Sequence, residues 1–128
     1  MKKFGAFVSM MIFVSSSAFA SSNFNLVMTC NGLNKTTGQK LIVQVYQNLA
    51  KGKDLVTVGQ QGDSNQQPYE ASVLAQEGLI SFDLEFVRNG LQLGANIVFG
   101  NQSVVSGVAL ESNNSDIARA VWTCSNDQ

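Results

Sequence analysis

The chain has 128 residues, of which 45% are hydrophobic and 13% are charged, and it contains no histidine. This length accommodates one domain, and the formal net charge of −1 makes the phosphate backbone of nucleic acids an unfavourable partner. The absence of histidine excludes the usual proton shuttle near neutral pH and every catalytic triad that depends on it.

The first twenty residues have the pattern of a secretory signal peptide. A positively charged start is followed by an apolar run of about a dozen residues that ends at Val14. Residues 18–20 then read Ala-Phe-Ala, the form of a cleavage site. The apolar run is shorter than the roughly 20 residues that a membrane-spanning helix needs. We therefore predict residues 1–20 as a signal peptide, residues 21–128 as a single all-β domain without a membrane span, and a periplasmic or secreted location.

The chain contains two cysteines, Cys30 near the start of the mature domain and Cys124 near its end. In an oxidising compartment, two cysteines usually pair. The absence of histidine and of a C-x-x-C motif makes a metal site or a disulfide-exchange site a poor alternative. We therefore predict one structural disulfide between these residues, with no metal ion and no cofactor.

The first half of the mature chain shows the period-two alternation of β-strands and no helical periodicity. Apolar and polar residues alternate over Phe24–Cys30 and over Leu41–Tyr46, and a short β-branched strand follows at Leu55–Val58. Asn31 and Gly32 both tolerate positive φ and are predicted to form the turn after the first strand.

Five further strands are predicted in the second half. Tyr69–Gln76 is assigned as a strand, with a short helix as the rival assignment because Ala, Glu, Leu and Gln favour helices. Ile80–Phe86 has the strongest half-buried alternation in the chain, and Leu91–Phe99 continues an apolar face. Val104–Leu110 and Ile117–Cys124 complete the set.

Two polar segments lack this alternation. Gly59–Pro68 contains no apolar residue except the proline, and Ser112–Asp116 is polar throughout. Both are predicted as loops. A loop as long as the first, in a compact domain, is either functional or an exposed flexible connection.

These elements predict a small antiparallel eight-stranded meander closed as a soluble β-barrel. Sequential hairpins favour a meander, and each apolar strand face needs a partner. Because disulfide-bonded Cα atoms lie within about 7 Å of each other, Cys30 and Cys124 place the first and last strands side by side. Closure also removes exposed edges. A two-layer β-sandwich is the alternative, and polar outward residues such as Asp83 and Glu85 argue against a membrane barrel.

Asp83 and Glu85 also form a carboxylate pair at strand spacing. Glycosidases use two carboxylates across a cleft, so hydrolysis by this pair is one hypothesis. Solvation of a half-exposed strand accounts for the pair better. We therefore expect no enzymatic activity and no catalytic residue.

Candidate residues for partner recognition come from the aromatic side chains and the polar loops. Tyr46 falls on the less apolar face of its strand and Tyr69 follows the long loop, and tyrosine is enriched at interfaces. The loops contribute the rest of the predicted partner-binding set: Gln61, Asp63, Asn65, Asn113 and Asn114. Trp122 falls on the apolar side near Cys124, and we predict that it packs against the disulfide.

The layout resembles that of the periplasmic lysozyme-inhibitor barrels of the MliC type. The shared features are a small exported domain, Cys30-Asn31-Gly32 near its start, eight predicted strands and Cys124 near its end. The resemblance implies inhibition of lysozyme by a segment of the Ser-Gly-Ala-basic-Tyr type that enters the lysozyme cleft. The nearest stretch here, Glu70–Leu74, departs from that segment, so no site residue is carried over.

The sequence thus favours an exported, non-catalytic binding module that recognises another protein through its loops. The alternatives are a lysozyme-inhibitor-like barrel and a carrier that holds a small apolar ligand inside the barrel. Large residues predicted to point inward argue that the interior is filled: Phe82, Phe86, Leu93, Phe99 and Trp122.

Overall fold

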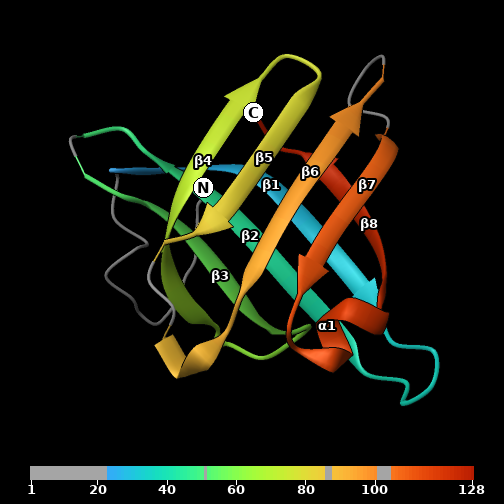
Figure 1. Ribbon diagram of the computed structural model, residues 1–128. Helices are drawn as coiled ribbons and strands as arrows, with labels where there is room; N and C mark the ends of the chain where they lie inside the picture. Colours follow the sequence, from blue (N-terminus) through green and yellow to red (C-terminus); the bar gives the residue numbers. More distant parts are fainter. Residues whose placement is uncertain (1–22, 51, 86–87, 101–104) are drawn as a thin grey trace.

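The computed structural model describes residues 23–50, 52–85, 88–100 and 105–128 (Figure 1). The predicted signal peptide, residues 1–20, lies outside the described residues, as do the predicted strand residues Phe86 and Val104. The side chains of Arg88, Val105 and Ser106 are likewise not described.

The described chain consists almost entirely of β-strands. Its elements, in chain order, are β1 (Phe24–Leu33), β2 (Lys40–Asn48), β3 (Asp54–Gln60), β4 (Gln67–Gln76), β5 (Leu79–Leu84), the 3₁₀ turn η2 (Arg88–Gly90), β6 (Leu93–Phe99), β7 (Val105–Ser112), α1 (Ser115–Arg119) and β8 (Val121–Asn126). None of the helices in these ranges is long and apolar enough to cross a membrane.

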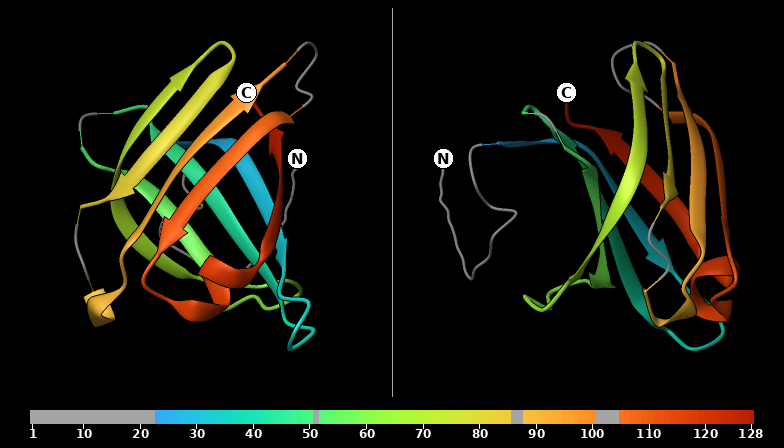
Figure 2. Two further views of the ribbon diagram at one scale, coloured as in Figure 1. Left: turned by 45° about the vertical axis from the view of Figure 1, so that its right-hand side comes forward. Right: turned by 60° about the vertical axis from the view of Figure 1, so that its left-hand side comes forward.

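The strands form one antiparallel sheet in the order β7-β6-β5-β4-β3-β2-β1-β8. Strands that follow each other along the chain pair from β1 to β7, and β8 returns to pair with β1. The sheet curls into a nearly closed barrel, whose two end strands, β7 and β8, meet near α1 and diverge away from it (Figure 2). The predicted eight-stranded meander barrel is confirmed, and the sandwich alternative is not formed.

The disulfide joins β1 to β8, as predicted. Cys30 and Cys124 lie directly opposite each other in the ladder, with Cα atoms 4.0 Å apart across a separation of 94 residues. A short Cα separation of this kind is typical of a non-hydrogen-bonded antiparallel pair. The bridge therefore connects the first strand of the chain with the last.

The core fills the inside of the barrel. The least exposed large side chains come from five strands: Val27, Met28, Val43, Val45, Val56, Ile80 and Ile97. Three large residues predicted to point inward, Phe82, Leu93 and Phe99, are buried, and Trp122 is partly buried against the same core. Strand β6 shows most plainly why these residues form the core, because its alternate residues face the barrel interior in a strict period of two.

The predicted turn at Asn31 and Gly32 is wrong. Both residues lie inside β1, which continues to Leu33 and pairs with β2 on one side and β8 on the other. The indole ring of Trp122 lies where a Cβ of Gly32 would be. The glycine is therefore explained by the space that the ring needs, and no turn is required.

The alternation predicted over Phe24–Cys30 is interrupted. The pairing of β1 with β2 shifts between Leu26 and Met28, which marks a β-bulge. A bulge inserts one extra residue into a strand, so Val27 and Met28 are both buried. The sequence pattern had placed Val27 on the opposite face from Met28.

The predicted loop Gly59–Pro68 is shorter in the structure. Strand β3 extends to Gln60 because Gly59 pairs with Ile42, and β4 already begins at Gln67, with Pro68 opposite Thr57. Only residues 61–66 connect the two strands. The strand assignment for Tyr69–Gln76 is confirmed against its helical rival.

The predicted loop Ser112–Asp116 and the strand predicted to begin at Ile117 need correction. The chain forms the short helix α1, and β8 begins only at Val121. The side chain of Asn114 caps α1 by accepting hydrogen bonds from the backbone N–H groups of Asp116 and Ile117. Ile117 is buried, which anchors the helix on the barrel.

Candidate functional site

Most of the predicted partner-binding residues lie at one end of the barrel. The β3–β4 connection carries Gln61, Asp63 and Asn65, and it lies at the same end as α1 (Figure 1). The segment that leads into α1 carries Asn113 and Asn114. We call this the α1 end of the barrel.

Tyr46 does not belong to this group. It lies near the far end of β2, where it is paired with residues of β1 and β3. Burial, and secondarily the negative charge of Asp127, raises the pKa of Tyr46 to about 12. A largely buried phenol of this kind is a poor first contact for a partner.

A hollow of about 400 Å³ opens at the α1 end. Its lining combines apolar side chains and amides: Val58, Tyr69, Asn89, Leu91, Asn113, Asn114 and Ile117. We call it the mouth hollow. It brings together three of the predicted residues, Tyr69, Asn113 and Asn114, although 44 positions of the chain separate the first from the second.

Tyr69 takes a different place from the one expected. It was predicted as a surface contact, but it is only 6% exposed, opposite the fully buried Val56 of β3. Tyrosine carries a large apolar body, which explains why the ring lies in the wall of the hollow. The ring is therefore not the surface contact that the sequence predicted.

Hydrogen bonds fix the two asparagines of the rim. Asn113 Oδ1 accepts from the backbone N–H of Gln92 at 2.8 Å, and its Nδ2 donates to the carbonyl oxygen of Gly90 at 2.7 Å. Asn114 Oδ1 serves the helix cap, while its Nδ2 has no hydrogen-bond partner among the described residues. Asn89 adds an exposed side chain on a backbone with φ of 62°. Folding thus fixes the side chains of Asn113 and Asn114 on the rim of the hollow.

The residues of the β3–β4 connection have local structural roles. Gln61 Nε2 donates to the carbonyl oxygen of Leu41 at 2.9 Å. Asp63 Oδ1 accepts from the backbone N–H of Asn65 at 2.8 Å, a pattern typical of turns. None of the three lines the mouth hollow, so the structure separates them from Tyr69, Asn113 and Asn114.

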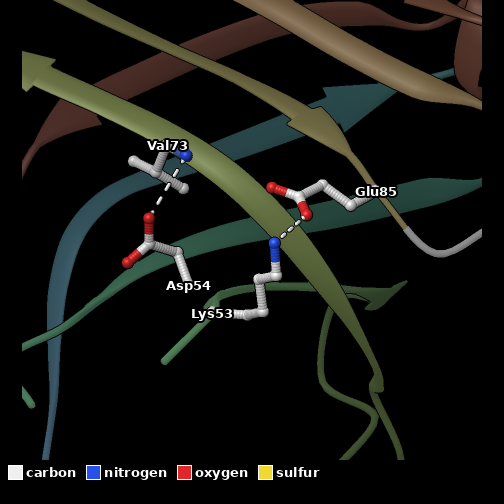
Figure 3. A network of polar contacts seen from close by, with 4 residues as sticks. All are labelled: Lys53, Asp54, Val73 and Glu85. Carbon is white, nitrogen blue, oxygen red and sulfur yellow. Dashed lines mark hydrogen bonds and ion pairs between the residues drawn. The ribbon is translucent and has the colours of Figure 1, made fainter. Parts of the chain in front are cut away.

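The carboxylate pair considered for hydrolysis is divided by the structure. Asp83 lies within β5, whereas Glu85 follows the end of the strand and forms an ion pair with Lys53 (Figure 3). The hydrogen bond and the charge of Glu85 raise the pKa of Lys53. The nearby Asp54 accepts from the backbone N–H of Val73 at 3.2 Å (Figure 3), so it also serves the fold.

A second hollow, of about 630 Å³, lies on the outer face of the sheet where β5, β6 and β7 run side by side. A smaller one, of about 150 Å³, adjoins it. Both are lined by Asp83, Gly94 and Glu111. Sequence reasoning missed Gly94 and Glu111, because only the pairing of three strands brings them beside Asp83.

The described residues contain no group of three or more histidine, cysteine, aspartate or glutamate side chains placed to hold a metal ion. No protein-family model, curated protein or solved structure matches this chain. The geometry of the three hollows is therefore the basis on which a function can be proposed.

Proposed function

We propose that this protein is an exported, non-catalytic binding module that recognises another protein at the α1 end of its barrel. The mouth hollow is the observation that supports this proposal. Apolar concave sites with a few fixed polar groups are the default binding sites of proteins. The lining of the hollow mixes apolar side chains with amides, and it gathers three of the residues that the sequence had marked for recognition.

The composition of the rim favours a protein partner. Its amides offer hydrogen bonds of the kind that a peptide backbone can complete, while the partly buried Leu91 provides apolar contact. A ligand held deep inside the barrel is a weaker alternative, because Val56, Ile80 and Ile97 are fully buried across the interior. We therefore infer that the partner presents a protruding loop whose tip enters the mouth hollow.

Two further observations support the proposal. The described lining of the mouth hollow has amide, apolar and phenol side chains but no carboxylate, thiol or ammonium group, so it lacks the groups that most often transfer protons. The disulfide between Cys30 and Cys124 is typical of exported proteins. Both fit a binding role outside the cytoplasm.

A variant pair tests the site. Asn89→Gly removes the rim amide while tolerating the positive φ, and Leu91→Glu places a charge in the apolar wall. Leu49→Glu makes the same chemical change in the β2–β3 connection, where Leu49 is 66% exposed. A photo-reactive residue at position 89 would identify the partner in envelope or host extracts. Lysozyme is the first purified candidate, because the layout resembles that of lysozyme inhibitors.

We expect the purified partner to bind the N89G/L91E variant at least tenfold more weakly than the native protein, as measured by calorimetry. The L49E variant should bind with native affinity. Equal binding by N89G/L91E and native protein would contradict the proposal. Crosslinking of the partner to a photo-reactive residue at position 49, but not at position 89, would also contradict it.

A further inference from the structure

We propose a second recognition surface, a cation-binding trough on the outer face of β5, β6 and β7, which takes the lysine or arginine side chain of an extended peptide from a partner protein. The trough consists of the two adjoining outer hollows, which share Asp83, Gly94 and Glu111. This proposal does not depend on the mouth hollow.

The register of the sheet sets the shape of the trough. Asp83 lies opposite Gly94 in the β5–β6 ladder, and Gly94 lies opposite Glu111 in the β6–β7 ladder. Two acidic residues therefore flank a position without a side chain. Neighbouring strands are about 4.8 Å apart, so the Cα atoms of the two acids are separated by about 10 Å. Backbone forms the floor between them.

The charge of the trough is available to a ligand. Asp83 and Glu111 are exposed, and no hydrogen bond or ion pair joins either carboxylate to another described residue. The carboxylate of Asp83 lies over the floor, where a Cβ on Gly94 would collide with it. Glu85 differs, because Lys53 already neutralises it. A cation above Gly94 would meet two uncompensated carboxylates, and charge-assisted hydrogen bonds to them are the stronger kind.

The trough continues along the strands beyond this point. The smaller hollow adds short side chains from all three strands: Ser81, Asn96 and Ala109. From Asn113 at one end of the larger hollow to Ala109 in the smaller one is four residues, about 13 Å of extended chain. An extended peptide of four or five residues therefore fits, with its basic residue over Gly94 and its backbone near the amide of Asn96.

Charge complementarity favours this occupant over a neutral polymer such as a glycan. The mature domain predicted from the sequence has six basic and nine acidic residues, so the wider field also attracts a cationic segment. Exposed ion pairs contribute little individually, and the expected affinity for a short peptide is accordingly weak, in the millimolar range.

The test uses two peptides that differ in one charge. Acetyl-Ser-Ala-Arg-Ala-Ser-amide carries the cation, and the same peptide with citrulline in place of arginine keeps the shape without the charge. In NMR titrations of the ¹⁵N-labelled protein, we expect the arginine peptide to shift the amide signals of Asp83, Gly94 and Glu111. The citrulline peptide should bind about tenfold more weakly, and added salt should weaken only the arginine peptide.

Two double variants test whether the arginine peptide binds at the carboxylates of the trough. D83N/E111Q should lower the affinity for the arginine peptide about tenfold. E77Q/D127N removes the same number of charges at the opposite end of the barrel and should leave the affinity unchanged. Equal binding of both peptides by the native protein would overturn the proposal and needs no variant. A neutral oligosaccharide that shifts these same amides more strongly than the arginine peptide would overturn it in favour of a glycan groove.

The two proposals fail separately. The Asn89→Gly variant changes no charge and leaves the described lining of the trough intact, so it should bind the arginine peptide with native affinity whether or not the mouth hollow binds a partner. Loss of peptide binding in that variant would contradict the placement of the cation in the trough.

Discussion

The identity of a single residue in this barrel is often explained by the side chain that packs over it from the neighbouring strand. Gly32 shows this most clearly, because the indole of Trp122 covers it from β8. Trp122 is itself held by a hydrogen bond from Nε1 to the carbonyl oxygen of Ile117 at 3.0 Å. One glycine, one tryptophan and the short helix therefore form a connected unit beside the disulfide.

Gly32→Ala should destabilise the protein. Its Cβ would lie 2.8 Å from the Trp122 ring, and overpacking of this kind costs about 1–3 kcal/mol. Gly107→Ala is the matched control, because the nearest atom to its Cβ is 3.9 Å away, an ordinary contact. Urea denaturation measures both. A G32A variant as stable as G107A would show that the ring moves aside without cost.

Tyr46 should make stability fall at high pH. Its pKa is about 12 in the folded protein, against an ordinary value of 10.0. The folded state therefore retains the phenolic proton that the unfolded state loses, and the free energy of unfolding decreases as pH rises from 10 to 12. A two-unit difference corresponds to about 2–3 kcal/mol. Denaturation at several pH values should show this decrease in the native protein and a smaller one in Tyr46→Phe.

At the scale of elements, the segment between β7 and β8 is both a connection and part of the rim of the mouth hollow. Residues 113–114 hold the η2 side through Gln92 and Gly90 and cap α1 on the other side. Because the same asparagines fix two elements, the rim of the mouth hollow is set by folding.

Asn114→Ala should therefore weaken α1. Loss of an N-cap side chain costs about 1 kcal/mol, and the measurable result is a lower free energy of unfolding with faster amide exchange at Ile117. Asn114→Asp keeps the capping oxygen and should retain near-native stability. Identical exchange in the alanine and aspartate variants would contradict the capping role.

At the scale of the whole molecule, closure depends on β8. It follows α1 and crosses to pair with β1, while in the described chain no ladder joins it to β7 (Figure 2). Unpaired edges invite association with other strands. The covalent bond from Cys124 to Cys30 keeps β8 in place where hydrogen bonds act on one side only.

Removal of this bond should cost much of the stability. In the chain-entropy model, a closed loop of nearly 100 residues contributes about 4–5 kcal/mol. The Cys30→Ala/Cys124→Ala variant should lose a stability of this size in urea denaturation, and a reducing agent should affect only the native protein. Native stability in the double variant would show that β8 is held by packing alone.

Local patterns predicted the strands of this chain well where apolar and polar residues alternate without interruption. The strands predicted over Ile80–Phe86 and Leu91–Phe99 have that pattern, and the structure forms β5 and β6 there, with β5 ending at Leu84 and β6 beginning at Leu93. The pattern failed at Val27, because a bulge depends on the partner strand, and at Ser115–Arg119, because five residues are too few to show a helical period.

The candidate sites were less predictable, because they also depend on how distant parts of the chain pair. Asn113, Asn114 and Tyr69 could be selected as residue types, but their meeting with Leu91 and Ile117 required the curled sheet. The trough was not predictable, since Asp83, Gly94 and Glu111 become neighbours only through the register of two ladders.

The amino-acid sequence by itself determined that the chain is a series of sequential strands whose first and last members are joined, because alternating burial is a property of neighbouring residues and a disulfide demands proximity. Tertiary structure alone decided which side chains share a surface, because the curvature and register of the sheet bring together residues that are distant in sequence. Both proposed binding surfaces arise from that second kind of information.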